Sequence, residues 1–365
     1  MQAFFRALTL RRYKILICAV TLVAIAAGFV TSWVFFLLAE QAGVTAAQDR
    51  LMVKTRATAK SLESAFLLIR SELVTITLYP EIETNNIPEA RKLLTRAVTA
   101  ADHPALKQLS LTSRAGTLLV LANKEGDTRD EGTSLVDRSY YQWAKTAKPG
   151  AFFVSEPLIP RAGINRGKQS LVAATPVFLN GQFNGVLHAS ISVEDLTINY
   201  LNTLNVPSEK STASYVIDQK GIAIATPFTD LIGIDTRAYA RQKQWPGYET
   251  YLSMVDAMTS GKEGSRVYAF MGSDGVAKRW INAFSPVFAG NAAFFSIASA
   301  VPYAEAEGLV TNIYTIRLVS LAITILFAAV GVCILIFGVY VAQQDGYNRG
   351  LKDGYHFKKK PSSGT

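Results

Sequence analysis

The fold is decided by residues 135–192, which read LVDRSYYQWAKTAKPGAFFVSEPLIPRAGINRGKQSLVAATPVFLNGQFNGVLHASIS. Asp137 to Trp143 has the composition of a short helix, predicted over 137–148, and three apolar runs follow it, at 151–158, 169–179 and 184–193. Gly, Pro and an Asn-Gly pair separate these runs, and such residues mark the turns between antiparallel strands. The stretch therefore predicts an antiparallel sheet with one helix laid across it, an α+β arrangement.

A candidate anion site begins at Arg138. Tyr140, Tyr141 and Trp143 follow it in the same predicted helix. A guanidinium beside aromatic rings that face a sheet suits a small anion with an apolar or planar body. The alternative is a surface arginine whose methylene stem covers tyrosines of the core.

Two long apolar runs, at 15–39 and 318–342, flank the middle of the chain. Each exceeds the roughly 20 residues that cross a bilayer as a helix, and neither contains a charged residue. Both are predicted to be transmembrane helices. The first is longer than the roughly 7–15 apolar residues of a cleaved signal peptide, so we interpret it as an uncleaved anchor.

Most of the formal net charge of +9 lies beside these two runs, because residues 1–14 carry +4 and residues 343–365 carry +3. Positive charge stays on the cytoplasmic side of a membrane, so both termini are predicted to be cytoplasmic. Residues 40–317 would then lie outside the membrane. The middle of the chain is close to neutral, which argues against a surface that binds nucleic-acid phosphates.

The outer part divides into a stalk and two similar units. The stalk, residues 40–87, is predicted to be a long helix, because one apolar face recurs at helical spacing up to about residue 78. Residues 88–205 and 206–305 each contain a strand–turn–strand, a helix and three further strands. The turn at 113–116 of the first unit corresponds to 218–221 of the second, which indicates a duplicated α+β module.

Five short motifs carry a resemblance to a known family. They are Asp137-Arg138-Ser139-Tyr140-Tyr141, Glu156-Pro157, Ala174-Thr175-Pro176-Val177, Gly181-Gln182-Phe183-Asn184-Gly185-Val186-Leu187 and Val216-Ile217-Asp218-Gln219-Lys220-Gly221. Over about residues 40–312 the chain resembles the double Cache family of extracytoplasmic sensor domains. The resemblance implies two PAS-like sheets on one long helix between two transmembrane spans.

The resemblance also implies that the membrane-distal unit binds a ligand. Amino-acid-binding members hold the carboxylate with an Arg-x-Trp-Tyr signature, which Arg138, Tyr140 and Tyr141 match with a tyrosine in place of the tryptophan. Leu158 stands where the family pattern has a tyrosine for the amino group, and Ser190 where it has an aspartate. A buried ammonium without a charged partner costs several kcal/mol. We therefore expect a small carboxylate or another anion, not an α-amino acid.

Catalytic, metal and cofactor chemistry is not indicated. The three histidines, His103, His188 and His356, are not at metal-ligand spacing, and neither a nucleophile elbow nor a phosphate loop is present. His188, on the last strand of the first unit, could face the pocket or the core, and we favour a satisfied histidine of the core. The second unit shows no cluster of polar groups comparable to that at Arg138. We expect neither an enzyme nor a cofactor.

Residues 343–365 are too few and too polar to form a core, and their lysines are expected to contact anionic lipid headgroups. A sensor of this kind, as in chemotaxis, would signal through a separate partner or through a further part of a longer protein. The small residues Ala24, Gly28 and Ser32 favour close packing with another helix, and we expect a homodimer. The alternative function is a membrane-anchored assembly module that senses nothing.

Overall fold

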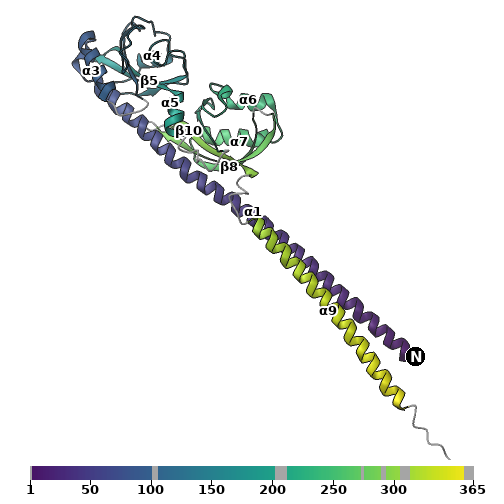
Figure 1. Cartoon of the computed structure of the whole chain (residues 1–365). Helices are drawn as coiled ribbons and strands as arrows, with labels where there is room; N and C mark the ends of the chain where they lie inside the picture. Colours follow the sequence, from purple (N-terminus) through teal and green to yellow (C-terminus); the bar gives the residue numbers. More distant parts are fainter. Residues whose placement is uncertain are drawn as a thin grey trace, which may run out of the picture. The chain divides into compact units, whose positions relative to one another are not determined.

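A computed structural model describes residues 2–100, 106–201, 212–272, 275–288, 293–304 and 313–356 (Figure 1). The chain divides into two compact units. One unit is Thr45–Ala306, and the other combines Met1–Val44 with Glu307–Thr365. Each unit is described by itself below.

Helix α1 spans Gln2–Ile76, so the predicted first span and the predicted stalk are one continuous helix. No proline occurs before Pro80, which stands at the first turn of the next helix. A proline is tolerated there because the N–H it lacks has no partner within the helix. The stalk helix predicted to about residue 78 is confirmed.

The first module follows α1 and contains one five-stranded antiparallel sheet. The strand order is β2-β1-β5-β4-β3, and the turn between β1 and β2 is closed by the Gly116 N–H donating to the Ser113 carbonyl. The elements are α2 (Pro80–Glu83), α3 (Ile87–Ala100), β1 (Gln108–Ser113), β2 (Leu118–Asn123), α4 (Ser139–Ala144), β3 (Phe153–Val154), β4 (Ser170–Leu179) and β5 (Gln182–Ser192).

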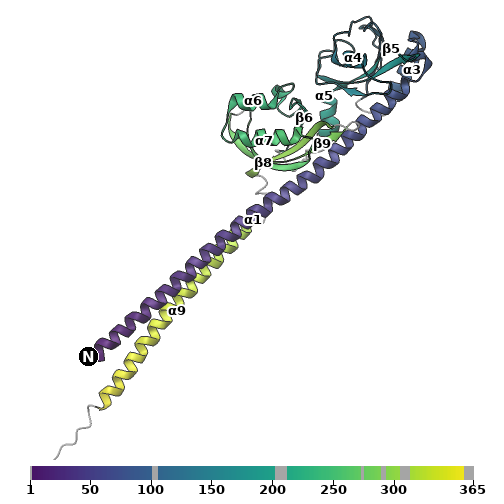
Figure 2. The same ribbon diagram turned by 180° about the vertical axis from the view of Figure 1, so that it is seen from behind.

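The second module repeats this order as β7-β6-β10-β9-β8, which confirms the predicted duplication. Figure 2 shows this module with α6, α7, β6, β8 and β9 labelled. Helix α5 (Val193–Leu196) and a π-helical turn (Thr197–Leu201) lead out of the first sheet. The remaining elements are β6 (Ala213–Asp218), β7 (Ala223–Ala225), a 3-10 turn (Thr229–Leu231), α6 (Thr236–Lys243), α7 (Tyr248–Thr259), β8 (Gly264–Met271), β9 (Ala277–Phe288) and β10 (Ala293–Pro302).

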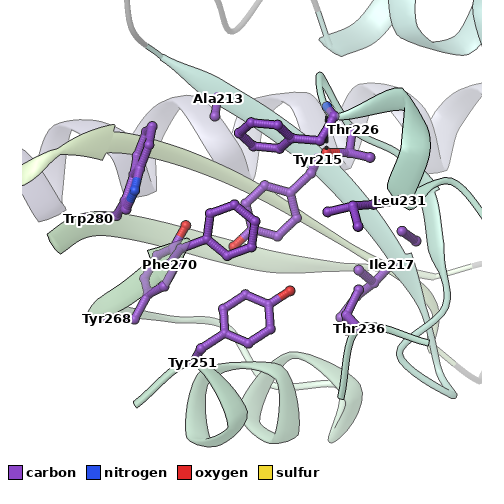
Figure 3. A pocket seen from close by; sticks show the side chains of 12 residues that line it. Ala213, Tyr215, Ile217, Thr226, Leu231, Thr236, Tyr251, Tyr268, Phe270 and Trp280 are labelled. Atoms are coloured by element: carbon purple, nitrogen blue, oxygen red, sulfur yellow. Dashed lines mark hydrogen bonds between the residues drawn. The ribbon is translucent and has the colours of Figure 1, made fainter. Parts of the chain in front are cut away.

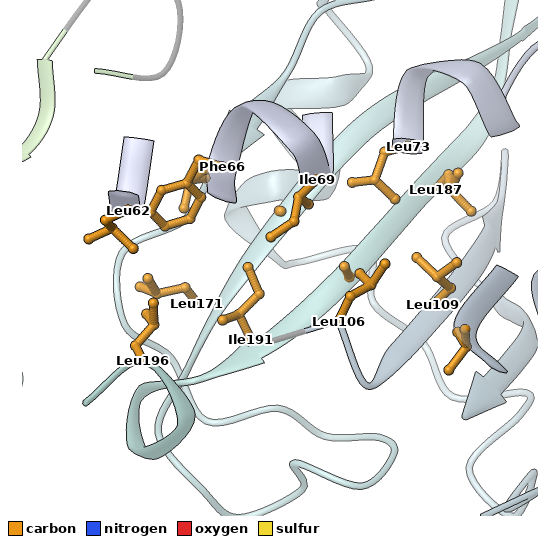
Figure 4. Close-up of a cluster of buried hydrophobic side chains, with 14 of the residues drawn as sticks. Leu62, Phe66, Ile69, Leu73, Leu106, Leu109, Leu171, Leu187, Ile191 and Leu196 are labelled. Carbon is orange, nitrogen blue, oxygen red and sulfur yellow. The ribbon is translucent and has the colours of Figure 1, made fainter. Parts of the chain in front are cut away.

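One hydrophobic core joins α1 to both sheets. Leu62, Phe66, Ile69 and Leu73 point from α1 toward leucine and isoleucine side chains of the first module (Figure 4). The Phe66 ring also lies 5.6 Å from the ring of Phe295 on β10, centroid to centroid. The apolar stripe of the stalk therefore packs on its own sheets.

Strand alternation sends the other residues of each sheet away from α1. In β4, Leu171 and Ala173 belong to the core under α1, whereas Val172 and Ala174 pack with α4 on the opposite face. The second sheet divides in the same way, with Val216 of β6 under α1 and Ile217 in a separate core that includes α7. Each sheet thus has a second face, pointing away from α1, which packs against short helices of its own module.

In the unit formed by Met1–Val44 and Glu307–Thr365, residues of α1 pack with α9 (Ile313–His356). Two helices in the described residues are long and apolar enough to cross a membrane. The hydroxyls of Ser32 and Ser320 lie 2.8 Å apart, and a Cβ added to Gly28 would lie 3.7 Å from Thr324. Small residues allow such close approach of two helices. Gly28 and Ser32, which we predicted to face another helix, therefore face α9 of the same chain.

Several local expectations were wrong. Helix α4 is shorter than the predicted 137–148, because Arg138 is extended (φ −74°, ψ 137°) and caps it. The strand predicted at 151–158 is regular only at 153–154, with one further bridge between Leu158 and Ser170. Helix α6 was not predicted, and residues 343–356 continue α9. For residues 194–205 the sequence predicts a helix that leaves the first sheet; helical structure is observed to residue 201, and residues 202–205 lie outside the described residues.

Candidate ligand site in the first module

A cavity lies on the face of the first sheet that points away from α1. It measures about 330 Å³ when its open mouth is included. Strand alternation places Gln108 and Ser110 of β1 and His188 and Ser190 of β5 on this face, and Ser110 pairs directly with His188 across the two strands. The side chains that contribute polar atoms to the lining are Gln108, Ser110, Arg138, Tyr140, Arg161, His188 and Ser190.

Arg138 reaches the cavity from the N-terminal end of α4. Its backbone caps the helix, and its side chain donates a hydrogen bond from Nη2 to the carbonyl of Ile159, at 3.0 Å. No carboxylate in the described ranges forms an ion pair with it. The guanidinium therefore keeps its net positive charge at the cavity and has further N–H groups for a ligand.

A second guanidinium, that of Arg161, lines the same cavity. It forms a two-pronged pair with Asp137, with nitrogen–oxygen distances of 2.7 and 2.6 Å. The hydrogen bond from Arg161 lowers the pKa of Asp137, and the charge of Arg138 lowers it further. This local group of two arginines and one aspartate carries a net charge of +1.

Tyr140 and His188 form the buried wall, with ring centroids 5.0 Å apart. Burial raises the pKa of Tyr140, so its hydroxyl stays protonated, and this hydroxyl bonds to no described residue. Burial lowers the pKa of His188 to about 4, so the imidazole is neutral at pH 7. Its Nδ1 atom is buried without a hydrogen-bond partner among the described residues. Such a group is costly to bury unless something pairs with it.

The remaining polar groups are held in place by their neighbours. The side-chain oxygen of Gln108 accepts from the Ile164 N–H at 2.9 Å, and its Nε2 donates to the Ser110 hydroxyl at 3.2 Å. Asn165 donates to the hydroxyl oxygen of Ser190 at 3.2 Å. The loop between β3 and β4 therefore fixes both ends of the polar wall before any ligand arrives.

Four of the six predicted site residues line this cavity, namely Arg138, Tyr140, Leu158 and Ser190. The other two do not. The hydroxyl of Tyr141 donates to the Arg114 carbonyl at 2.5 Å, and the ring of Trp143 stacks on Phe153 at 5.0 Å. Adjacent positions of a helix point in different directions, so Tyr140 and Tyr141 cannot both face the cavity.

Sequence reasoning missed three polar lining residues, Gln108, Ser110 and Arg161, and it favoured the core over the pocket for a fourth, His188. Gln108 and Ser110 alternate with the buried Leu109 and Leu111, and this pattern could have placed both on the ligand face. Arg161 lies in a loop without periodicity, so no pattern signalled it. His188 was interpreted as a core residue, yet it lines the cavity with an unpaired nitrogen.

Comparison with solved structures gives the fold class. The periplasmic sensory domain of the Campylobacter jejuni chemoreceptor Tlp1 matches with a TM-score of 0.53 at 16% identity, covering 72% of this chain and 98% of that domain. The ligand-binding domain of the Pseudomonas fluorescens chemoreceptor CtaA, in complex with L-alanine, matches with a TM-score of 0.51 at 17% identity, covering 70% and 97%. The ligand-binding domain of Mlp24, solved with asparagine, matches with a TM-score of 0.50 at 19% identity, covering 75% of this chain and 99% of that domain.

No protein-family model and no curated protein gives a significant match to the chain. The structural matches show that the chain has the fold of these chemoreceptor sensory domains. The double Cache fold expected from the sequence is thereby confirmed, with its two antiparallel sheets on one long helix.

Proposed function

We propose that this chain is an extracytoplasmic sensor whose first module binds a small carboxylate or another small anion. The observation that carries the proposal is Arg138, a guanidinium that faces a polar cavity without a carboxylate partner among the described residues. A carboxylate can pair with a guanidinium through two parallel hydrogen bonds. The rings of Tyr140 and His188 lie together on the wall of the same cavity, where the rest of the ligand would sit.

The lining argues against an α-amino acid. CtaA and Mlp24 were solved with amino acids, but the described residues that line this cavity include neither Asp nor Glu. Leu158 and Ser190 line the cavity at the positions where the family pattern has a tyrosine and an aspartate. An ammonium group would therefore be desolvated without an opposite charge, beside two guanidinium groups.

The proposed arrangement places residues 40–317 outside the inner membrane and both termini in the cytoplasm. Within that domain, 40–87 is the stalk, 88–205 the ligand-binding unit and 206–305 the unit nearer the membrane. The helix α1 supports this arrangement, because it continues without interruption from the apolar run into the core under both sheets. A ligand that favours one packing of the first module would bias this helix.

We also propose that the chain forms a homodimer and that the lysines of residues 343–365 contact anionic lipid headgroups. A sensor with this architecture passes its signal to a separate membrane or cytoplasmic protein, or to a further part of a longer chain. Fusion of a periplasm-dependent reporter enzyme after residue 130 and after residue 356 tests the topology. Activity of the second fusion, or inactivity of the first, would contradict it.

The test of the ligand is calorimetric titration of the full chain in lipid nanodiscs with small carboxylates, amino acids, amines and sugars. We expect binding of at least one carboxylate and loss of that binding in Arg138→Ala. The matched control is Arg129→Ala, which removes the same charge from an exposed arginine paired only with Asp127. Tight binding of a free amino acid would overturn the anion assignment. Absence of any binding would favour the assembly module.

A further inference from the structure

The second module contains a larger cavity that differs in chemistry from the first (Figure 3). It measures about 470 Å³ when its mouth is included, and it lies on the face of the second sheet that points away from α1. Six aromatic side chains surround it, namely Tyr215, Phe228, Tyr251, Tyr268, Phe270 and Trp280. Pockets lined mainly by aromatic and other apolar side chains typically hold small molecules.

The sheet places these rings together although they are far apart in the sequence. Tyr268 of β8 pairs directly with Trp280 of β9, and Phe270 follows Tyr268 on the same face of β8. Tyr251 points toward the cavity from α7, as Figure 3 shows. Phe228 belongs to the loop that follows β7 and is half-buried at the cavity. Five of the six rings thus come from regular elements, which hold them in place.

The polar atoms of the lining are few and mostly satisfied. The Tyr215 hydroxyl accepts from Asn282 Nδ2 at 3.1 Å and points to the Met254 sulfur at 3.3 Å, and the Thr236 hydroxyl donates to the Gly221 carbonyl at 2.8 Å. The exception is Trp280, whose Nε1–H is buried and has no acceptor among the described residues. An indole N–H can only donate, so this group needs an acceptor.

The lining also carries no formal charge. The described residues around the cavity include neither Asp, Glu, Lys, Arg nor His. An anion or a localised cation would therefore lose its hydration without gaining an opposite charge. Aromatic faces attract diffuse cations, but such an ion cannot accept a hydrogen bond from the Trp280 N–H.

We propose that this cavity is a second ligand site, which takes an uncharged planar molecule with a carbonyl or ring-nitrogen acceptor directed at Trp280 Nε1. The rings sandwich the flat body of the ligand, and the acceptor pairs the N–H that is otherwise buried alone. The two modules then read different chemistries, an anion in the first and a neutral planar compound in the second.

Three probes of nearly equal shape test the charge preference. These are benzamide (neutral), benzoate (anion) and benzamidine (cation), titrated calorimetrically at pH 7 into the full chain in lipid nanodiscs. The chain carries Arg138→Ala in this series, so that the proposed anion site of the first module does not bind benzoate. We expect benzamide to bind and the two charged analogues to bind at least tenfold more weakly. Tighter binding of benzoate or benzamidine would overturn the proposed ligand class, and failure of benzamide, nicotinamide and uracil alike at millimolar concentration would overturn the site.

Two variants locate the binding. Trp280→Phe removes the N–H and keeps a ring, and we expect benzamide to bind about fivefold more weakly, the effect of one neutral hydrogen bond. Ala213→Leu fills the cavity from a half-buried lining position, and we expect no binding. Benzamide binding that survives Ala213→Leu would place the ligand elsewhere.

A cross-comparison separates this inference from the proposed function. Arg138→Ala should leave benzamide binding unchanged, because Arg138 lines only the cavity of the first module. Trp280→Phe should leave carboxylate binding unchanged for the same reason. Loss of benzamide binding in Arg138→Ala would overturn the second site. The proposed anion site of the first module is tested separately, by the carboxylate titrations described above.

Discussion

The ring of His188 lies 5.0 Å from the ring of Tyr140, centroid to centroid, and the imidazole Nδ1 has no hydrogen-bond partner among the described residues. A neutral histidine and a protonated phenol thus form the buried wall of a cavity whose rim carries two guanidinium groups. Both groups are uncharged at pH 7, because burial opposes ionisation of each. The positive charge of the site therefore comes from the arginines alone.

Stability should fall in mild acid because of His188. Its pKa is about 4 in the folded chain, against the ordinary value of 6.5 that it takes in the unfolded chain. Below pH 6.5 the unfolded chain binds a proton that the folded chain does not, so the free energy of unfolding decreases from about pH 6.5 to about pH 4. The decrease should reach about 3 kcal/mol and then level off.

The measurement is urea unfolding between pH 4 and pH 8, compared with His188→Gln, which is neutral throughout. Carboxylates titrate in both proteins, so the difference between the two curves isolates the histidine. We expect the wild type to lose about 3 kcal/mol relative to His188→Gln between about pH 6.5 and about pH 4. Parallel curves would show that His188 has the same pKa in the folded chain as in the unfolded chain, and is therefore open to water.

Gly163 should resist substitution more strongly than a neighbouring glycine of the same loop. Its φ of +84° disfavours other residues, and an added Cβ would lie 1.9 Å from Oε1 of Gln108. Gly167 has a similar φ of +77° but nothing within 4 Å of an added Cβ. Both Ala variants should lose about 1–3 kcal/mol to backbone strain. Gly163→Ala should lose at least about 1 kcal/mol more through the clash.

Denaturant unfolding of the two variants checks the difference. Because Gln108 lines the cavity of the first module, Gly163→Ala should also weaken ligand binding, whereas Gly167→Ala should not. Equal stability of the two variants would mean that the loop relaxes away from Gln108 at little cost.

Asp235 should be worth about 1 kcal/mol as the N-cap of α6. Its side chain accepts from the Arg237 N–H at 2.9 Å and from the Ala238 N–H at 3.3 Å, two donors that the helix itself leaves without partners. Asp235→Ala should lower the free energy of unfolding by about that amount, while Asp235→Asn should be nearly neutral. A similar loss in both variants would assign the effect to the charge of Asp235.

The sequence predicted most of the fold because the physical signals were local. Alternating apolar strands, the Asn180-Gly181 turn and a proline-free stalk each decide their own element. Helix α6 was missed because its eight residues, TRAYARQK, are mostly polar, and only the capping aspartate marks its start. Regular elements built from apolar periodicity were thus predicted, and a short polar helix was not.

The sites depend on contacts between distant residues, which local patterns do not encode. Arg138 was predicted, but Arg161 and Gln108 come to the same cavity from 23 and 30 positions away in the chain. The aromatic lining of the second module is spread from Tyr215 to Trp280, so no window of sequence showed it as a cluster. These residues become neighbours through the pairing of β8 with β9, and the sequence does not show the register of that pairing.

Phe66 should be among the most costly side chains of the Thr45–Ala306 unit to truncate. It is 1% exposed, and it contacts Phe295 of the second sheet while its neighbours on α1 pack on the first. Phe66→Ala should lower the free energy of unfolding by about 3–5 kcal/mol, because a buried ring is removed and a cavity remains. Leu68→Ala, at a 54% exposed position two residues away, should change it by less than about 0.5 kcal/mol. Urea unfolding at two protein concentrations measures both, and a cost for Leu68→Ala that grows with concentration would show that a second copy of the chain covers this face of α1. A small effect of Phe66→Ala would contradict the shared core, since the two sheets would then be held on α1 by other contacts.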